Sequence, residues 1–155
     1  MPVRQQDISQ IAGKIERYCA SAERCRQDVI RKLSQSGVEP ATIEKLIRRL
    51  ERRGFLDEKR YARLFAREKF HLSAWGKIKI RHALRQKGIS DDLIEVALEE
   101  IPQEEYLATL RKLFSQKIHA LAATDKASRK EKVFRYLAGR GFEPDLITRL
   151  MENDG

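Results

Sequence analysis

A single structural unit recurs three times along this 155-residue chain, and each copy is marked by a glycine: Gly37, Gly88 and Gly141. Apolar residues keep the same offsets from all three glycines: a leucine four residues before, a β-branched residue eight before, an apolar residue directly after and an isoleucine six after. The glycines lie 51 and 53 residues apart. A repeat of this length is typical of modular helical arrays, in which each small unit shares a core with its neighbours. We therefore expect a protein that lies along an extended partner.

Nearly every segment has the apolar spacing of an amphipathic helix. Before the second glycine, for example, apolar residues share one face and cations line another. Each repeat glycine then ends a helix, because glycine adopts the left-handed conformation without a steric clash at Cβ. The following helices are expected to start beside Pro40, Ser90 and Pro144. No stretch alternates with a period of two residues, so we predict an all-α fold without a sheet.

Three helices in each unit predict about nine helices in an elongated, gently curved array of three tandem three-helix units. We place the units at residues 1–53, 54–101 and 102–155, with hinges at Arg53–Leu56 and Ile101–Gln103. Units of about 45–50 residues can barely bury a core alone, so adjacent units are expected to pack on one another. The expected helices span residues 8–20, 23–36, 40–53, 57–72, 75–87, 90–100, 103–122, 127–139 and 143–152.

The charge of the chain is large and unevenly placed. The net charge is +9 and the isoelectric point is about 9.8, which favours polyanionic partners or a protein–nucleic acid assembly. Residues 58–90 carry ten Lys or Arg against two acids, and residues 111–140 carry nine against two. Between them, the acidic block 91–105 carries seven acids and no Lys or Arg. Segregation on this scale is typical of interaction surfaces.

The sequence contains no recognisable catalytic or cofactor-binding motif. The histidines His71, His82 and His119 lie far apart, and neither a phosphate-binding glycine loop nor a nucleophile elbow is present. Cys19 and Cys25 are six residues apart, which would place them on different faces of a helix, and no second ligand pair accompanies them. We therefore predict no enzymatic activity, no cofactor and no metal site. Without a secretory signal or an apolar run of about 20 residues, we expect a cytoplasmic protein that does not span a membrane.

The strongest candidate for binding is the basic stretch 75–89, which opens with the only tryptophan of the chain. Trp75 itself is expected to pack between units, because large aromatic side chains contribute mainly to cores. Three arginines on the preceding helix form a second basic stripe, and the two stripes are expected to merge into one surface. An ordinary solvated helix face is the alternative for these cations. The expected partner-binding or DNA-binding residues are Arg60, Arg63, Arg67, Lys77, Lys79, Arg81, Arg85 and Lys87.

Three segments of the chain resemble the RecX family, bacterial regulators of the RecA recombinase. GFLDEKRYARLF at 54–65 is similar to the family block Gly-Leu-Leu-Asp-Asp-Glu-Arg-Phe-Ala. WGKIKIRHALRQKGI at 75–89 is similar to a family stretch with a glycine, a basic residue, an Ile-Arg-x-x-Leu core and a Lys-Gly-Ile end. CRQDVIRKLSQSG at 25–37 resembles the motif of the first unit. The resemblance covers residues 20–101 well, whereas the third unit matches mainly in its periodicity.

Departures from the family block include Phe55, Lys59 and Tyr61. The resemblance implies three tandem three-helix units that bind the RecA filament formed on single-stranded DNA. Family members are understood to lie in the groove of that filament and to limit its growth or activity, including ATP hydrolysis, strand exchange and the co-protease role in the SOS response. The acidic block 91–105 would then pair with a basic patch on RecA. We expect the protein itself to be a monomer.

Two other functions fit parts of the sequence. One is a direct DNA-binding module, because short three-helix units resemble helix-turn-helix elements whose basic helices enter a groove. Against it, the cations are spread over three units, and few Asn or Gln residues lie along the basic stripes to read bases. The other is a scaffold that binds an unrelated acidic protein, which fits the charge but not the family motifs. Comparing binding to RecA filaments with binding to bare single-stranded DNA separates these functions.

Overall fold

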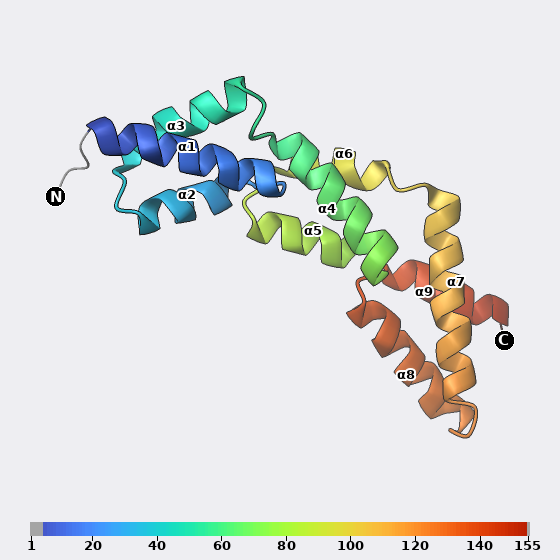
Figure 1. Ribbon diagram of the computed structural model, residues 1–155. Coiled ribbons are helices and arrows are strands. Elements are labelled where there is room, and N and C mark those ends of the chain that lie inside the picture. Colours follow the sequence, from blue (N-terminus) through green and yellow to red (C-terminus); the bar gives the residue numbers. More distant parts are fainter. Residues whose placement is uncertain (1–4, 155) are drawn as a thin grey trace.

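The computed structural model describes residues 5–154, which form nine α-helices and no strand. The helices are α1 (Gln5–Ser21), α2 (Arg26–Gln35), α3 (Pro40–Arg52), α4 (Glu58–Ser73), α5 (Lys77–Gln86), α6 (Asp91–Glu99), α7 (Gln103–Ala120), α8 (Lys126–Gly139) and α9 (Pro144–Asp154). They follow one another as three groups along a bent, elongated molecule with the two ends of the chain far apart (Figure 1). The expected all-α array is confirmed, and each helix starts and ends within three residues of its expected bounds.

We call α1–α3 the first unit, α4–α6 the second unit and α7–α9 the third unit. The expected limits of the units, 1–53, 54–101 and 102–155, remain a prediction, and residues 1 and 155 lie outside the described part. Two helix starts shift by three residues: α1 begins three residues earlier than expected and α2 three residues later. At α2 the cause is local. There the backbone of Cys25 is extended, and its N–H donates to the Asp28 carboxylate at 3.2 Å. This hydrogen bond satisfies an amide just ahead of the helix and so sets where the helix begins.

The repeat glycines end α2, α5 and α8 as the sequence predicts. Their φ angles are +79° at Gly37, +77° at Gly88 and +97° at Gly141. In each unit, the residue that follows the glycine donates its N–H to the carbonyl of the repeat leucine, which lies four residues before the glycine. These hydrogen bonds measure 3.1–3.2 Å. The side chains of both residues are buried in every copy. The repeated spacing therefore encodes a Schellman turn together with its hydrophobic contact.

The buried side chains form two clusters. One lies within the first unit and extends from Ala12 in α1 to Leu56, just before α4. The other is continuous through the second and third units, from Tyr61 to Ile147. Cys25, at the start of α2, also belongs to this second cluster. The second and third units thus share one core, while the first unit has a core of its own.

The two cysteines do not lie on one helix, contrary to the expectation. Cys19 belongs to α1 and is buried in the first core, whereas Cys25 precedes α2 and is fully buried beside the second unit. Burial raises the pKa of both thiols, that of Cys25 to about 11. Neither side chain is a thiolate at neutral pH, so both act as small core residues.

Polar contacts hold the first unit to the second. They are the Arg26 backbone N–H to the Glu58 carboxylate at 3.2 Å, Arg60 Nε to the Glu23 carboxylate at 2.8 Å, and Lys87 Nζ to the Asp28 carboxylate at 3.1 Å. The second oxygen of Glu58 is buried without a hydrogen-bond partner, and burial raises the pKa of this carboxyl group. The expected hinge at Arg53–Leu56 lies at this junction.

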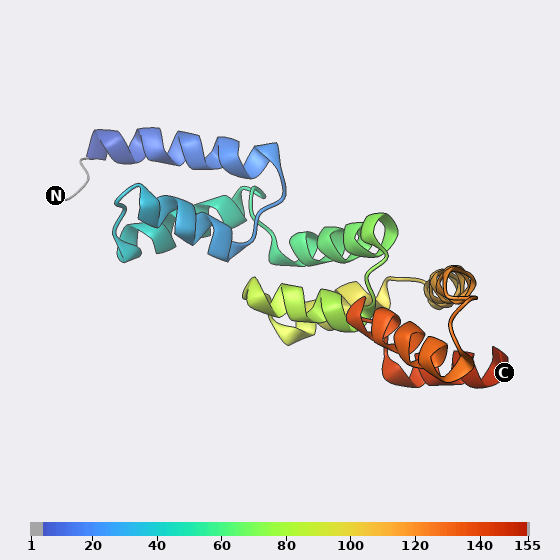
Figure 2. The same cartoon turned by 90° about the horizontal axis from the view of Figure 1, so that it is seen from below.

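The second and third units meet through their backbones, where the end of α8 lies beside the turn between α4 and α5 (Figures 1 and 2). The Gly76 N–H donates to the Arg140 carbonyl at 2.8 Å, and the Ile78 N–H donates to the Gly141 carbonyl at 3.0 Å. Amides at the start of a helix have no partner within that helix, so the third unit here completes α5. A Cβ on Gly76 would overlap the backbone of Gly141, which explains why glycine stands at this contact.

Tyr106 of α7 adds a third link at the same junction. The Lys77 N–H donates to its phenolic oxygen at 3.0 Å, and its O–H donates to the Glu143 carboxylate. The ring is fully buried and packs against Phe70 and Phe142, with ring centroids 5.7 and 5.3 Å away. The expected hinge at Ile101–Gln103 is therefore spanned by a shared aromatic core as well as by hydrogen bonds.

Candidate partner-binding surface

Five of the eight cations expected to contact a partner form ion pairs with acids of the same chain. The pairs are Arg60–Glu23 at 2.8 Å, Arg63–Glu100 at 2.7 Å, Arg81–Glu95 at 2.7 Å, Arg85–Asp91 at 2.9 Å and Lys87–Asp28 at 3.1 Å. Three of the five acids belong to the block 91–105. Folding thus brings the basic stripes and the acidic block together, although they are separate segments of the sequence.

Arg81 and Glu95 form the most enclosed pair on the α5–α6 surface. The arginine side chain is 28% exposed, and its Nε and Nη2 donate to the two carboxylate oxygens at 2.7 and 3.3 Å. These hydrogen bonds lower the pKa of Glu95 and raise the pKa of Arg81. Because the folded pKa of Glu95 is depressed, the pair stabilises the fold above the ordinary pKa of a glutamate and is lost as the pH falls through the folded value.

Arg67, Lys77 and Lys79 are the other three expected contact residues, and within residues 5–154 none of them forms an ion pair. Arg67 is exposed and borders a cavity of about 220 Å³ between α4 and the α6–α7 connection. The ammonium group of Lys77 lies over the Tyr106 ring, 4.9 Å from its centroid. These three cations therefore have no acid of residues 5–154 within ion-pair distance, although Glu100 and Glu105 line the same cavity as Arg67.

Trp75 is half-buried and packs against the core shared by the second and third units. The contacts of its ring are with Phe65, Lys69 and Lys79 of the second unit, so packing between units stays a prediction. The ammonium groups of Lys79 and Lys69 lie over its ring, 4.6 and 4.8 Å from the centroid. Lys69 was missed as a site residue because its place two positions after Arg67 puts it on another face of α4. Its membership of the basic run 58–90 was the one signal that could have indicated it.

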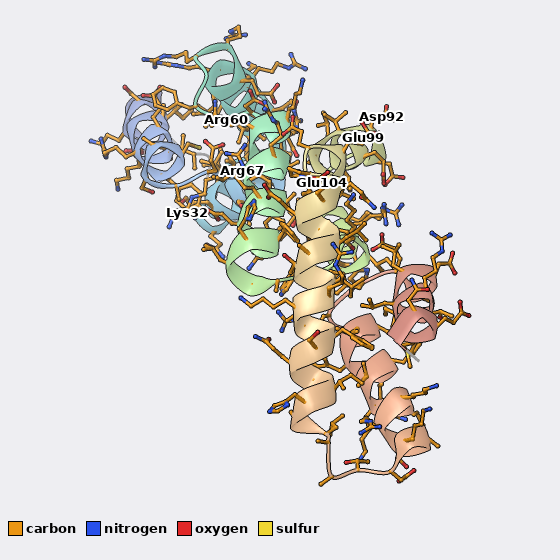
Figure 3. All side chains as sticks on the ribbon, turned by 90° about the vertical axis from the view of Figure 1, so that its right-hand side faces the viewer. Lys32, Arg60, Arg67, Asp92, Glu99 and Glu104 are labelled. Carbon is orange, nitrogen blue, oxygen red and sulfur yellow. The ribbon has the colours of Figure 1, made fainter. Side chains whose placement is uncertain are left out.

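Three carboxylates of the acidic block are exposed and unpaired within residues 5–154, so they are available to a partner. Asp92 and Glu99 on α6 and Glu104 at the start of α7 lie on the same side of the molecule (Figure 3). All three are exposed, and the described part of the chain offers none of them an ion pair. These unpaired carboxylates of the block thus lie on one side of the molecule, on α6 and at the start of α7.

Reversing the charge of the basic stripe on α5 is expected to destabilise the fold. From the sequence alone, Lys77, Arg81 and Arg85 are expected to be exposed, so exchanging them for glutamate would leave stability intact. The structure instead predicts that Arg81→Glu lowers the free energy of unfolding by about 1 kcal/mol, because an attraction to Glu95 becomes a repulsion.

Urea denaturation followed by circular dichroism measures this loss. The exchanged pair Arg81→Glu with Glu95→Arg should recover most of it, and Arg67→Glu should change stability by less than about 0.5 kcal/mol. Equal stabilities for all three variants would contradict a structural role for the pair.

No helix in the described range 5–154 is long and apolar enough to cross a membrane. The same residues contain no group of three or more His, Cys, Asp or Glu that could hold a metal ion.

Comparison with known proteins identifies the family. Models of the second and third three-helix domains of RecX match residues 57–98 and 103–151. The regulatory protein RecX of Prosthecochloris aestuarii is 33% identical over 137 residues, which cover 87% of this chain and 87% of that protein. This chain belongs to the RecX family. The RecX match over 103–151 also extends the resemblance to the third unit, where the sequence alone showed mainly periodicity.

Other RecX proteins differ in how much of their length this family member covers. RecX of Pseudomonas fluorescens is 33% identical over 88% of this chain and 86% of its own length. RecX of Clostridium botulinum is 36% identical over 118 residues, but the chain spans only 55% of that longer relative. The crystal structure of RecX from Lactobacillus salivarius has a TM-score of 0.88 over 97% of both chains at 23% identity, which shows that the fold is shared.

Proposed function

We propose that this RecX family member is a negative regulator of the RecA recombinase. It binds the RecA filament on single-stranded DNA, lies in the filament groove and limits filament growth. Through this binding it lowers ATP hydrolysis, strand exchange and the co-protease activity of the filament. It acts as a cytoplasmic monomer, and it has no enzymatic activity or cofactor of its own.

The observation that supports this function best is the continuity of an elongated body. The second and third units share one core, and three amides at the start of α5 bond to the third unit. Such a body spans an extended partner without first having to be ordered, so little conformational entropy opposes binding. A filament groove, whose walls are protein and whose axis is nucleic acid, matches both the shape and the mixed charge of this molecule.

The proposed contact set remains the eight cations named from the sequence, but their contributions differ. Arg67, Lys77 and Lys79 can meet a partner's anions directly. Each of the five paired cations must give up a carboxylate of this chain before it can bind an anion of the partner. This exchange contributes little net free energy to binding. We therefore expect single replacements of Arg67 to weaken filament binding more than single replacements of Arg63.

The runner-up function, a direct DNA-binding module, is weakened by the charge of α6. In a helix-turn-helix protein, the later helix of the motif enters the major groove. The corresponding helix of the second unit, α6, carries four acids and no Lys or Arg. Phosphates would repel it, so this unit is poorly suited to reading a duplex.

Adding this protein to RecA, ATP and single-stranded DNA is expected to lower the rate of ATP hydrolysis at ratios well below one protein per RecA subunit. A molecule bound along the groove or at a growing end controls many subunits, so stoichiometric amounts are unnecessary. A coupled ATPase assay measures the effect, with heat-denatured protein as the control. An unchanged rate at a one-to-one ratio would overturn the proposed function.

A further inference from the structure

The turn that joins α4 to α5 carries unusually exposed apolar side chains. Leu72, in the last turn of α4, is 81% exposed, and Ile78, in the first turn of α5, is 42% exposed. These are two of the four large apolar side chains that are exposed in the described part of the chain. Single exposed apolar residues are common, but Leu72 and Ile78 flank one short turn, which makes this turn a candidate contact site.

The turn is held in one conformation before any partner arrives. Ala74 has a left-handed backbone with φ +52°, which is uncommon for a residue other than glycine. The Trp75 N–H donates to the Lys69 carbonyl at 3.0 Å. From the third unit, the Arg140 guanidinium donates to the carbonyls of Ser73 and Ala74. A strained and braced turn of this kind is preorganised for binding.

Cations border the apolar surface. Lys69 lies three residues before Leu72, so the two side chains are neighbours on α4. Lys79 approaches from α5, and its ammonium group shares the Trp75 ring with that of Lys69. Neither lysine forms an ion pair with any residue in the range 5–154. One acid, Glu68, lies four residues before Leu72 on the same helix and is also exposed. Two lysines against one acid leave the border net positive, so the complementary surface is an apolar pocket with carboxylates on its rim.

Such a pocket belongs to a protein and not to a nucleic acid. The exposed aliphatic side chain of Leu72 has no counterpart on a phosphate backbone. Stacking of a base needs an aromatic face that is open, and two ammonium groups already lie over the Trp75 ring. The exposed aliphatic side chain and its cationic border thus favour a protein partner.

We propose that Leu72 inserts into an apolar pocket on a protein partner, and that Lys69 and Lys79 pair with carboxylates on the rim of that pocket. This inference rests on the proposed function, under which the partner is the RecA protein of the filament. It assigns to the α4–α5 turn a protein contact that is separate from the contacts made by Arg67.

The substitution Leu72→Ser tests the inference. Since the side chain is almost fully exposed, thermal melting should be unchanged. Binding to the RecA filament on single-stranded DNA is expected to weaken about tenfold, as for a central apolar anchor of an interface. Binding to bare single-stranded DNA should stay the same. Leu72→Met should bind the filament like the parent, and Ile30→Ser, a matched change at a 41% exposed position on α2, should also have no effect.

The outcomes distinguish this inference from the proposed function. If the parent binds the filament and Leu72→Ser binds it equally well, the protein contact at the turn is wrong and the proposed function stands. If Leu72→Ser weakens binding to bare DNA as much as binding to the filament, Leu72 is not a protein anchor and the inference is again wrong. If the parent does not bind the filament, the proposed function fails and the inference fails with it.

Discussion

Replacing Gly76 by alanine is expected to lower the free energy of unfolding by about 3 kcal/mol and to abolish regulation of the filament. The added Cβ would overlap the backbone of Gly141, and a backbone cannot move aside as a flexible side chain can. Relief of that overlap would break the hydrogen bonds from Gly76 to Arg140 and from Ile78 to Gly141. The second and third units would then separate at their shared core.

Urea denaturation followed by circular dichroism measures the loss of stability, and the ATPase assay measures the loss of regulation. Gly139→Ala is the matched control, because a Cβ added at Gly139, the last residue of α8, meets no atom within 4 Å. That variant should be as stable as the parent or slightly more so, since alanine favours a helix over glycine. If Gly76→Ala and Gly139→Ala unfold at the same urea concentration, the backbone contact does not hold the units together.

Salt is expected to separate binding of the filament from binding of bare single-stranded DNA. For about five phosphate contacts, affinity for a bare strand should fall about a hundredfold between roughly 50 and 200 mM salt. Affinity for the RecA filament should fall much less, because apolar and shape-complementary contacts with protein are insensitive to salt. We therefore expect binding to the filament, but not to the bare strand, to persist at physiological salt.

Fluorescence anisotropy of a labelled oligonucleotide, alone and coated with RecA, measures both salt dependences. Arg67→Ala should reduce the slope for the bare strand by about 0.7, the value for one phosphate contact. Arg63→Ala should change it less, because this guanidinium already binds the Glu100 carboxylate at 2.7 Å. Equal slopes and equal affinities for the two targets would favour the direct DNA-binding module.

The sequence by itself determined the helices and their grouping, because helix ends depend on local physics. A leucine, a glycine four residues later and an apolar residue after it suffice to close a Schellman turn, and the chain repeats this pattern at Gly37, Gly88 and Gly141. The buried faces followed from the same spacing, since apolar residues three and four positions apart share one side of a helix. All of these signals lie within about ten residues of one another, so no knowledge of the tertiary structure was needed.

Only the tertiary structure decided which charges stay available and how the units are joined. Arg81 meets Glu95 across 14 positions, Arg63 meets Glu100 across 37, and Lys87 meets Asp28 across 59. The periodicity of the sequence cannot predict these ion pairs, because they depend on how α4 and α5 pack against other helices. From the sequence, Gly76 likewise looks like an ordinary residue at the start of a helix. Only the folded structure shows that its backbone packs against that of Gly141. Local spacing determines where a helix forms. A binding surface consists of the side chains that remain exposed and unpaired after residues far apart in the sequence have formed ion pairs or buried one another.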